Sequence, residues 1–167
     1  KRGYIGRKQD IDILVAMNSE SAREDVLALD PGAAVVYDEP LKLNEIRSDL
    51  VFYPVPFEDL VKPCCPDAKL RRLVRNMIYD GVLSRLLGIE MAEMERALEK
   101  QLGKKPKALE LNRAALAAGD AFAAEKLPKA DPFRAERMDA TRGKILIEAN
   151  AAVAVGAMMA GVTVVTW

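Results

Sequence analysis

The stretch that decides the fold is residues 11–38, which read IDILVAMNSESAREDVLALDPGAAVVYD. It opens with a largely apolar run over residues 11–17, which is the pattern of a buried strand. An amphipathic segment over residues 19–29 follows and predicts a helix with a serine at its start. After the turn residues Asp30-Pro31-Gly32, a second apolar run over residues 33–38 predicts another buried strand. Strand, helix and strand at this spacing predict a parallel crossover unit.

Further elements extend this unit. Residues 50–56 (LVFYPVP) predict a third strand, whose prolines place it at the edge of the sheet or at a strand end. Three amphipathic helices are then expected: one over residues 70–86 with Gly88 as its stop signal, one over residues 90–102 and one over residues 109–125. Their apolar stripes face a common core, so the predicted fold class is α/β.

A second unit is predicted near the carboxyl end of the chain. Residues 126–143 (KLPKADPFRAERMDATRG) are polar, contain two prolines and end in glycine, as linkers between domains do. After them we expect a short strand over residues 144–148, an alanine-rich helix over residues 149–160 and a strand over residues 162–167. The predicted organisation is therefore a domain over residues 1–125, a linker over 126–143 and the start of a second domain over 144–167.

The two ends predict that the chain is part of something longer. It begins with Lys1 rather than Met and has no N-terminal targeting signal, and it stops in a strand-like run without a turn or polar tail. The most apolar stretch, residues 151–165, is interrupted by Gly156 and Gly161. It is also shorter than the roughly 20 apolar residues that a membrane helix needs, so we expect no membrane partner.

Composition excludes several kinds of chemistry. The 167 residues include 25 Lys plus Arg, 25 Asp plus Glu and no His. The absence of histidine removes Ser/His/Asp and Cys/His nucleophiles and the usual zinc sites. Balanced charge argues against nucleic acid as a partner. Cys64 and Cys65 are adjacent and flanked by prolines, so we expect reduced thiols and a cytoplasmic protein.

The candidate ligand-binding residues fall in two basic clusters and at two asparagines. Arg71, Arg72 and Arg75 lie on one side of the long helix, and Lys104, Lys105 and Lys107 form the second cluster. Either cluster could hold an anion, although a solvated helix face is the simpler interpretation of both. Asn76 falls between apolar positions on the long helix, where a buried amide needs partners from a neighbouring helix or a ligand.

Asn150 is a candidate because of its place in the chain. It follows Glu148 at the predicted strand-to-helix junction, where open α/β sheets bind ligands. Capping of the helix by Asn150 is the simpler interpretation. The sequence contains no glycine-rich phosphate loop and no cysteine set for an iron–sulfur cluster, so the residues alone give no reaction and no metal site.

Several segments match one known family in order and spacing. They are residues 3–7 (GYIGR), 10–18 (DIDILVAMN), 52–56 (FYPVP), 75–79 (RNMIY), 103–105 (GKK), 110–112 (ELN), 131–138 (DPFRAERM) and 143–147 (GKILI). With them, the chain resembles the alpha subunit of the 2-oxoacid:ferredoxin oxidoreductases, of the 2-oxoglutarate type with a fused gamma domain. The resemblance implies a Rossmann-like, three-layer gamma domain that is incomplete at its N-terminus, followed by the first strand, helix and strand of a thiamine-pyrimidine-binding domain.

The resemblance also implies an activity. It is the CoA-dependent oxidative decarboxylation of 2-oxoglutarate to succinyl-CoA, with ferredoxin as electron acceptor. Thiamine diphosphate with Mg²⁺ and a [4Fe–4S] cluster would be held mostly by a partner beta subunit, in a heterodimer or a dimer of heterodimers. Coenzyme A would be the co-substrate, and the catalytic residues are expected outside this chain.

The site residues implied by the resemblance are few. Arg71, Arg72, Lys104 and Lys105 are candidates for the phosphates of coenzyme A, and Asn76 is a further candidate ligand contact. Glu148-Ala149-Asn150 departs from the Asp-Gly-Asn usual in the family, so only Asn150 is carried over as a candidate contact near the site.

Two other classes of function stay open at this point. The chain could be a non-catalytic assembly domain of a multi-subunit complex, which turnover of 2-oxoacids by the full subunit with its partner would test. It could also be a nucleotide-binding α/β module, which a glycine-rich loop before Lys1 would indicate.

Overall fold

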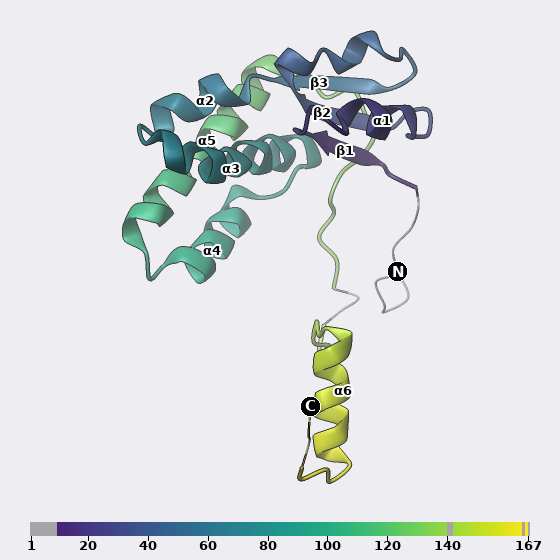
Figure 1. Cartoon of the computed structure of the whole chain (residues 1–167), viewed down its shortest axis with the longest axis vertical. Coiled ribbons are helices and arrows are strands. Elements are labelled where there is room, and N and C mark those ends of the chain that lie inside the picture. Colours follow the sequence, from purple (N-terminus) through teal and green to yellow (C-terminus); the bar gives the residue numbers. More distant parts are fainter. Residues whose placement is uncertain (1–9, 140–141, 165, 167) are drawn as a thin grey trace. The chain divides into compact units, whose positions relative to one another are not determined.

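The computed structural model describes residues 10–139, 142–164 and 166 (Figure 1). The chain divides into two compact units, one over Arg7–Glu136 and one that includes Arg137–Trp167. The GYIGR segment at residues 3–7 lies outside the described residues.

A parallel sheet forms the centre of the larger unit. Its strands, in the order β1-β2-β3, are β1 (Ile13–Ala16), β2 (Ala34–Asp38) and β3 (Val51–Val55). Ala34 pairs with Ile13 on one side and with Val51 on the other. The parallel strands confirm the predicted crossover unit. Pro54 lies within β3, which is at an edge of the described sheet, and an edge is where a residue without an amide hydrogen is tolerated.

Both faces of the sheet are covered, because side chains alternate along each strand. On one face Ala34, Val36 and Val55 pack into a core with α2, α3 and α5. On the other face Val35 and Tyr37 pack into a second core. That core also contains α1 (Ala22–Leu27) and the short helical turn η2 (Leu43–Glu45), which follows η1 (Glu39–Leu41). The predicted three-layer α/β architecture is confirmed.

The helical layer contains one helix more than the sequence patterns predict. It consists of α2 (Phe57–Cys64), α3 (Ala68–Leu87), α4 (Met91–Leu102) and α5 (Pro106–Lys126), which Figure 1 shows as a group beside the sheet. The last three are the predicted helices, and Gly88 ends α3 in the left-handed conformation at φ 69°. We did not expect α2, because it is short and contains Pro63. It forms because Phe57 and Val61, one turn apart, are both fully buried.

The smaller unit differs from the prediction. Its helix α6 (Ala149–Met159) is present, but residues 144–148 form no strand and Leu146 is 90% exposed. The described residues 162–164 and 166 of the second predicted strand are not in a strand either, and Val165 and Trp167 lie outside the described residues. A strand requires a hydrogen-bonded neighbour, and the described part of this unit offers none.

The segment predicted as a linker, residues 126–143, is partly packed. Leu127 and Asp131 are buried against the larger unit, and the Ala135 amide donates to the Leu87 carbonyl at 2.9 Å. The first part of the segment predicted as a linker therefore lies on the α/β unit. Among the described residues, no helix is long and apolar enough to cross a bilayer.

Candidate functional site

The ends of the three parallel strands bring polar groups to one edge of the sheet. Asn18 and Ser19 follow β1, Asp38 is the last residue of β2, and Phe57 begins α2 just after β3. In open α/β sheets this carboxyl edge is where ligands bind. This edge is therefore the candidate site.

Asp38 and Arg75 form the central charged pair of this edge. Their closest side-chain atoms, Arg75 Nη1 and Asp38 Oδ2, are 3.8 Å apart, and both side chains are mostly buried. Burial raises the pKa of Asp38 above its ordinary value, while Arg75 and the backbone of Phe57 act in the opposite direction. Arg75 Nε is buried without a hydrogen-bond partner among the described residues. The guanidinium of Arg75 thus keeps unused donor capacity beside the strand ends.

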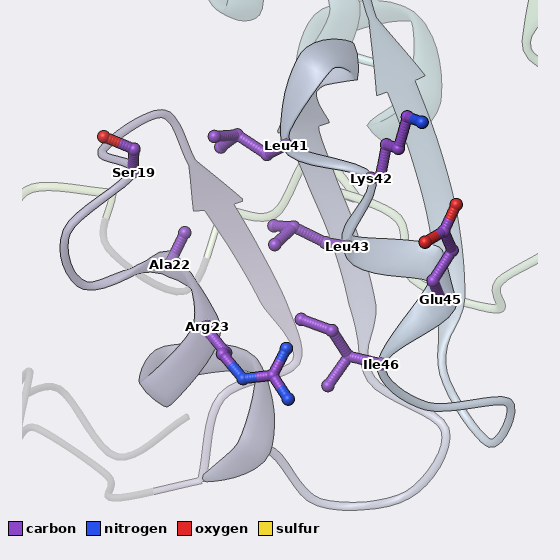
Figure 2. A pocket seen from close by; sticks show the side chains of 8 residues that line it. All are labelled: Ser19, Ala22, Arg23, Leu41, Lys42, Leu43, Glu45 and Ile46. Atoms are coloured by element: carbon purple, nitrogen blue, oxygen red, sulfur yellow. The ribbon is translucent and has the colours of Figure 1, made fainter.

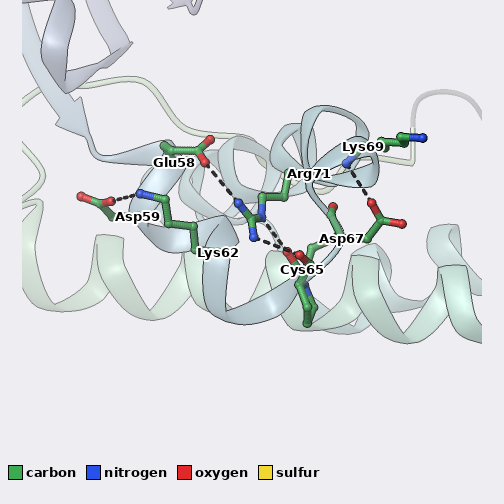
Figure 3. Close-up of polar contacts among 8 residues, drawn as sticks. Glu58, Asp59, Lys62, Cys65, Asp67, Lys69 and Arg71 are labelled. Carbon is green, nitrogen blue, oxygen red and sulfur yellow. Dashed lines mark hydrogen bonds and ion pairs between the residues drawn. The ribbon is translucent and has the colours of Figure 1, made fainter.

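Arg71, one turn earlier on α3, is held in place by carbonyl groups (Figure 3). Its Nε donates to the Cys65 carbonyl at 2.8 Å, and its Nη2 donates to the Pro66 carbonyl at 2.9 Å. Nη1 also lies 3.8 Å from a Glu58 carboxylate oxygen. These contacts tie the start of α3 to the end of α2. Arg71 is therefore a structural residue first, because these contacts hold its guanidinium group at the junction of α2 and α3.

Arg72, Lys104 and Lys105 are all exposed. Arg72 lies on the first turns of α3, and the two lysines lie in the turn between α4 and α5. Gly119 is the residue at which α5 crosses α3. The start of α5, next to the two lysines, is roughly 20 Å from Gly119 along the helix axis, at about 1.5 Å per residue. The two clusters therefore lie on separate elements, one on α3 and the other at the start of α5.

The expectation of a buried amide at Asn76 is wrong. Asn76 is exposed on α3, between the half-buried Arg75 and Met77. The apolar residues Val74 and Ile78 face the core, and Asn76 lies on the opposite side of the helix. It therefore needs no buried partner, and it remains free to contact a ligand.

The expectation that Asn150 caps α6 is also wrong. The helix begins at Ala149, its N-cap residue is Glu148, and no side chain makes a capping hydrogen bond. Asn150 is exposed within the first turn. The N-cap residue thus lies two positions before Asn150, within the usual uncertainty of helix ends.

A shallow hollow of about 390 Å³ opens beside the carboxyl end of β1 (Figure 2). Ala22, Leu41, Leu43 and Ile46 supply its apolar wall, and Ser19, Arg23, Lys42 and Glu45 supply its polar groups. Lys42 adopts a left-handed conformation with φ 48°, which few residues other than glycine adopt. This hollow was not predicted, because its walls come from short helical turns that leave no periodic pattern.

The described residues offer neither a cluster of metal ligands nor a Cys64 thiol of lowered pKa. No group of three or more His, Cys, Asp or Glu side chains in the described ranges could hold a metal ion. Cys64 is half-buried, and burial, together with Cys65, raises the pKa of its thiol above the ordinary value. Cys64 is therefore not an activated nucleophile.

Comparison with known proteins identifies the family. A family model described as pyruvate ferredoxin/flavodoxin oxidoreductase matches residues 4–122, which is most of the α/β unit. The chain belongs to this family. The match covers β1 to α5 and confirms the family resemblance of the sequence segments within it.

A solved protein with a similar structure supports the assignment to this family. It is the 2-oxoglutarate:ferredoxin oxidoreductase from Magnetococcus marinus, solved with 2-oxoglutarate, coenzyme A and succinyl-CoA bound. The two are 32% identical, with a TM-score of 0.78, and the similarity covers 90% of this chain and 26% of that one. This chain therefore spans about a quarter of the length of the solved relative. No curated protein matches it.

The sequence patterns did not predict that Asp38 and Arg75 lie next to each other. In the sequence, Arg75 belongs to the basic cluster of the long helix, and Asp38 is only the end of a predicted strand. The signal that could have joined them is topological, because the last residue of a central parallel strand lies at the ligand-binding edge.

Proposed function

We propose that the intact protein is a 2-oxoglutarate:ferredoxin oxidoreductase and that this chain is part of its alpha subunit. The reaction converts 2-oxoglutarate and coenzyme A to succinyl-CoA and CO₂, and the two electrons released pass to ferredoxin. The observation that carries the proposal is the 32% identity over 90% of the chain to an enzyme with these substrates bound. Membership of the family supports the general reaction, and this similarity supports the particular 2-oxoacid.

We infer that residues 1–125 act as the gamma domain and that the chain from residue 144 starts the thiamine-pyrimidine-binding domain. Residues 126–143 connect them. The proposed assembly is a cytoplasmic heterodimer, or dimer of heterodimers, of this alpha subunit with a beta subunit. Ferredoxin is the proposed electron acceptor, in keeping with the description of the family.

The described residues do not fit the iron–sulfur cluster of this reaction. They contain no metal-binding group, and Cys64 and Cys65 are too few to hold a [4Fe–4S] cluster. Thiamine diphosphate supplies the carbon–carbon bond cleavage in such enzymes. We place it, its Mg²⁺ and the cluster elsewhere in the assembly, mostly on the beta subunit, and assign none of their chemistry to this chain.

The residues of this chain fit a role in binding coenzyme A. Arg72, Lys104 and Lys105 are exposed cations that could meet its phosphates, and Arg71 could add a weaker contact despite its carbonyl partners. Arg75 keeps unused donors at the edge of the sheet. Asn76, on α3, is an exposed amide that could make a polar contact, and Asn150, in the smaller unit, is a separate candidate. Bound phosphates favour such cationic and amide donors.

The activity is tested with the intact protein, purified anaerobically with its co-purifying partner. Reduction of a viologen dye is followed with 2-oxoglutarate, pyruvate and 2-oxoisovalerate in parallel, each with and without coenzyme A. We expect reduction with 2-oxoglutarate that depends on coenzyme A. Reduction with pyruvate alone would keep the family and overturn the substrate. No reduction with any of the three, from a preparation that contains iron–sulfur cluster, would leave the assembly role.

The coenzyme A site is tested by charge removal at the exposed residues. The double variant Lys104→Gln/Lys105→Gln and the single variant Arg72→Gln should raise the KM for coenzyme A without changing the KM for 2-oxoglutarate. A matched control is Lys62→Gln, which removes another exposed lysine, one that pairs with Asp59 in α2 (Figure 3). An unchanged KM for coenzyme A in both variants would exclude these residues from its site.

A further inference from the structure

The segment after α5 is held to β3 by a buried hydrogen-bonded cluster. We call residues 128–135 the strap. Tyr53 of β3 donates its hydroxyl hydrogen to Asp131 Oδ2 at 2.5 Å. The same hydroxyl oxygen accepts the backbone amides of Ala130 at 2.9 Å and Asp131 at 3.1 Å. One phenol hydroxyl thus uses its donor and both its acceptor positions on the strap.

Asp131 is satisfied from the strap side as well. Its Oδ1 accepts from Lys129 Nζ at 2.6 Å and from the Phe133 amide at 2.8 Å. Lys129 Nζ also donates to the Phe133 carbonyl at 2.6 Å, which closes a compact turn. The Asp131 side chain is 1% exposed. A buried carboxylate with this many partners is strongly held, because breaking one contact leaves a buried polar group unpaired.

Apolar contacts and a backbone hydrogen bond also hold the strap. Leu127, just before it, is buried in the core that contains Val36, Val55 and Phe57, and Phe133 packs against the same core. At the far end, the Ala135 amide donates to the Leu87 carbonyl at the end of α3. The strap therefore contacts β3, the core and α3 in turn, although its composition is that of a linker.

We propose that the Tyr53–Asp131 pair is a lock that makes the strap a fixed part of the α/β unit. The chain then leaves that unit at Glu136, where the compact unit ends, and not at the end of α5. Any movement of the α/β unit relative to the residues that follow takes place beyond Glu136. The lock also shields two tryptic sites, Lys129 and Arg134, that lie within the strap.

Hydrogen–deuterium exchange of the purified full chain tests the lock directly. The amides of Ala130, Asp131, Phe133 and Ala135 are hydrogen-bonded, so the wild-type strap should be protected although it has no helix or strand. Exchange as fast as that of an unstructured peptide in the wild-type protein would overturn the proposal without any variant.

Tyr53→Phe removes the lock and keeps the buried ring. We expect the strap amides to exchange about tenfold faster or more, and trypsin to cleave after Lys129 or Arg134, while α5 stays protected. Asp131→Asn should act in the same direction through loss of the Lys129 contact. Unchanged exchange and cleavage in both variants would overturn the proposal.

Tyr37→Phe is the matched control. Tyr37 lies on the neighbouring strand, is 2% exposed against 3% for Tyr53, and donates its hydroxyl hydrogen to Asn44 at 2.8 Å. Its hydroxyl makes no contact with the strap. Faster exchange of the strap in Tyr37→Phe, to the extent seen in Tyr53→Phe, would mean that general destabilisation frees the strap, and this too would overturn the proposal.

Discussion

Gly81 of α3 and Gly119 of α5 pack backbone against backbone where the two helices cross. A Cβ atom at Gly81 would lie 2.1 Å from the Leu116 carbonyl oxygen, and one at Gly119 would lie 2.0 Å from the Ile78 carbonyl oxygen. Real Cβ atoms do not approach so closely, and the atoms they would meet are backbone. The crossing therefore depends on the absence of a side chain at both positions.

We predict that Gly81→Ala and Gly119→Ala each lower the free energy of unfolding. The added methyl forces α3 and α5 apart, and overpacking of this kind costs about 1–3 kcal/mol, occasionally more. Urea unfolding of the full chain measures the loss. The control is Gly156→Ala in α6, where a Cβ meets nothing within 4 Å and should not destabilise. Wild-type stability in both crossing variants would contradict the close approach.

A second prediction concerns the end of α3. Gly88 has φ 69°, and the Ile89 amide donates to the Ser84 carbonyl at 2.9 Å, which closes the helix end. Gly88→Ala should destabilise the protein by about 1–2 kcal/mol, because an alanine pays a steric cost in this conformation. Gly88→Asn should lose less, since asparagine tolerates it better. Thermal unfolding of the two variants side by side checks the order, and an alanine variant as stable as the asparagine variant would refute it.

Periodic and punctuated elements were predictable from the sequence. The apolar stripe of α3 predicted this helix, and Gly88 predicted its end. The apolar run that contains Val35 and Val36 predicted a buried strand. The helix α2 was not predicted, because a proline at position 63 argues against a helix and the two buried residues one turn apart are too weak a pattern to indicate one. The strands expected on either side of α6 are absent from the described residues. A strand forms only by hydrogen bonding to a neighbouring strand, and an apolar sequence run does not show whether such a neighbour exists.

The candidate site was less predictable, because it too depends on contacts between residues far apart in the sequence. Arg71 and Arg75 look alike in the sequence, yet one is satisfied by two carbonyls and the other keeps a buried unpaired Nε. Asn76 looked buried because its neighbours are apolar, but it lies on the outer side of the helix. The lock between Tyr53 and Asp131 joins residues 78 positions apart, which no local pattern can reveal.

The contact between Arg47 and α1 gives a third prediction. Arg47 Nη1 donates to the carbonyls of Val26, Leu27 and Leu29, while Nε and Nη2 bind Asp49. These carbonyls lie at the end of α1, where helices leave acceptors unpaired. Arg47→Gln should lower the Tm by several degrees. Arg96→Gln, which removes an exposed arginine paired with Glu93, should leave the Tm within about 1 °C. Equal shifts in the two variants would contradict the capping role.

The last prediction is the pH dependence of the lock. Burial alone would raise the pKa of Asp131, but hydrogen bonds from Lys129, Tyr53 and the Phe133 amide outweigh it and hold the pKa below the ordinary value. A carboxylate whose pKa is lower in the folded than in the unfolded state stabilises the protein above the unfolded value, about 3.9. That contribution is lost as the pH falls through the lower, folded value.

Asp131→Asn should therefore be less stable than wild type at neutral pH by about 1.5–3 kcal/mol, the cost of a lost hydrogen bond to a charged group. The difference between the two proteins should stay constant down to about pH 5 and shrink below about pH 4. Urea unfolding of both proteins across this range measures it, with other carboxylates cancelling in the comparison. A difference that grew as the pH fell would mean that Asp131 is protonated in the folded protein, and the lock would then rest on a neutral carboxyl group.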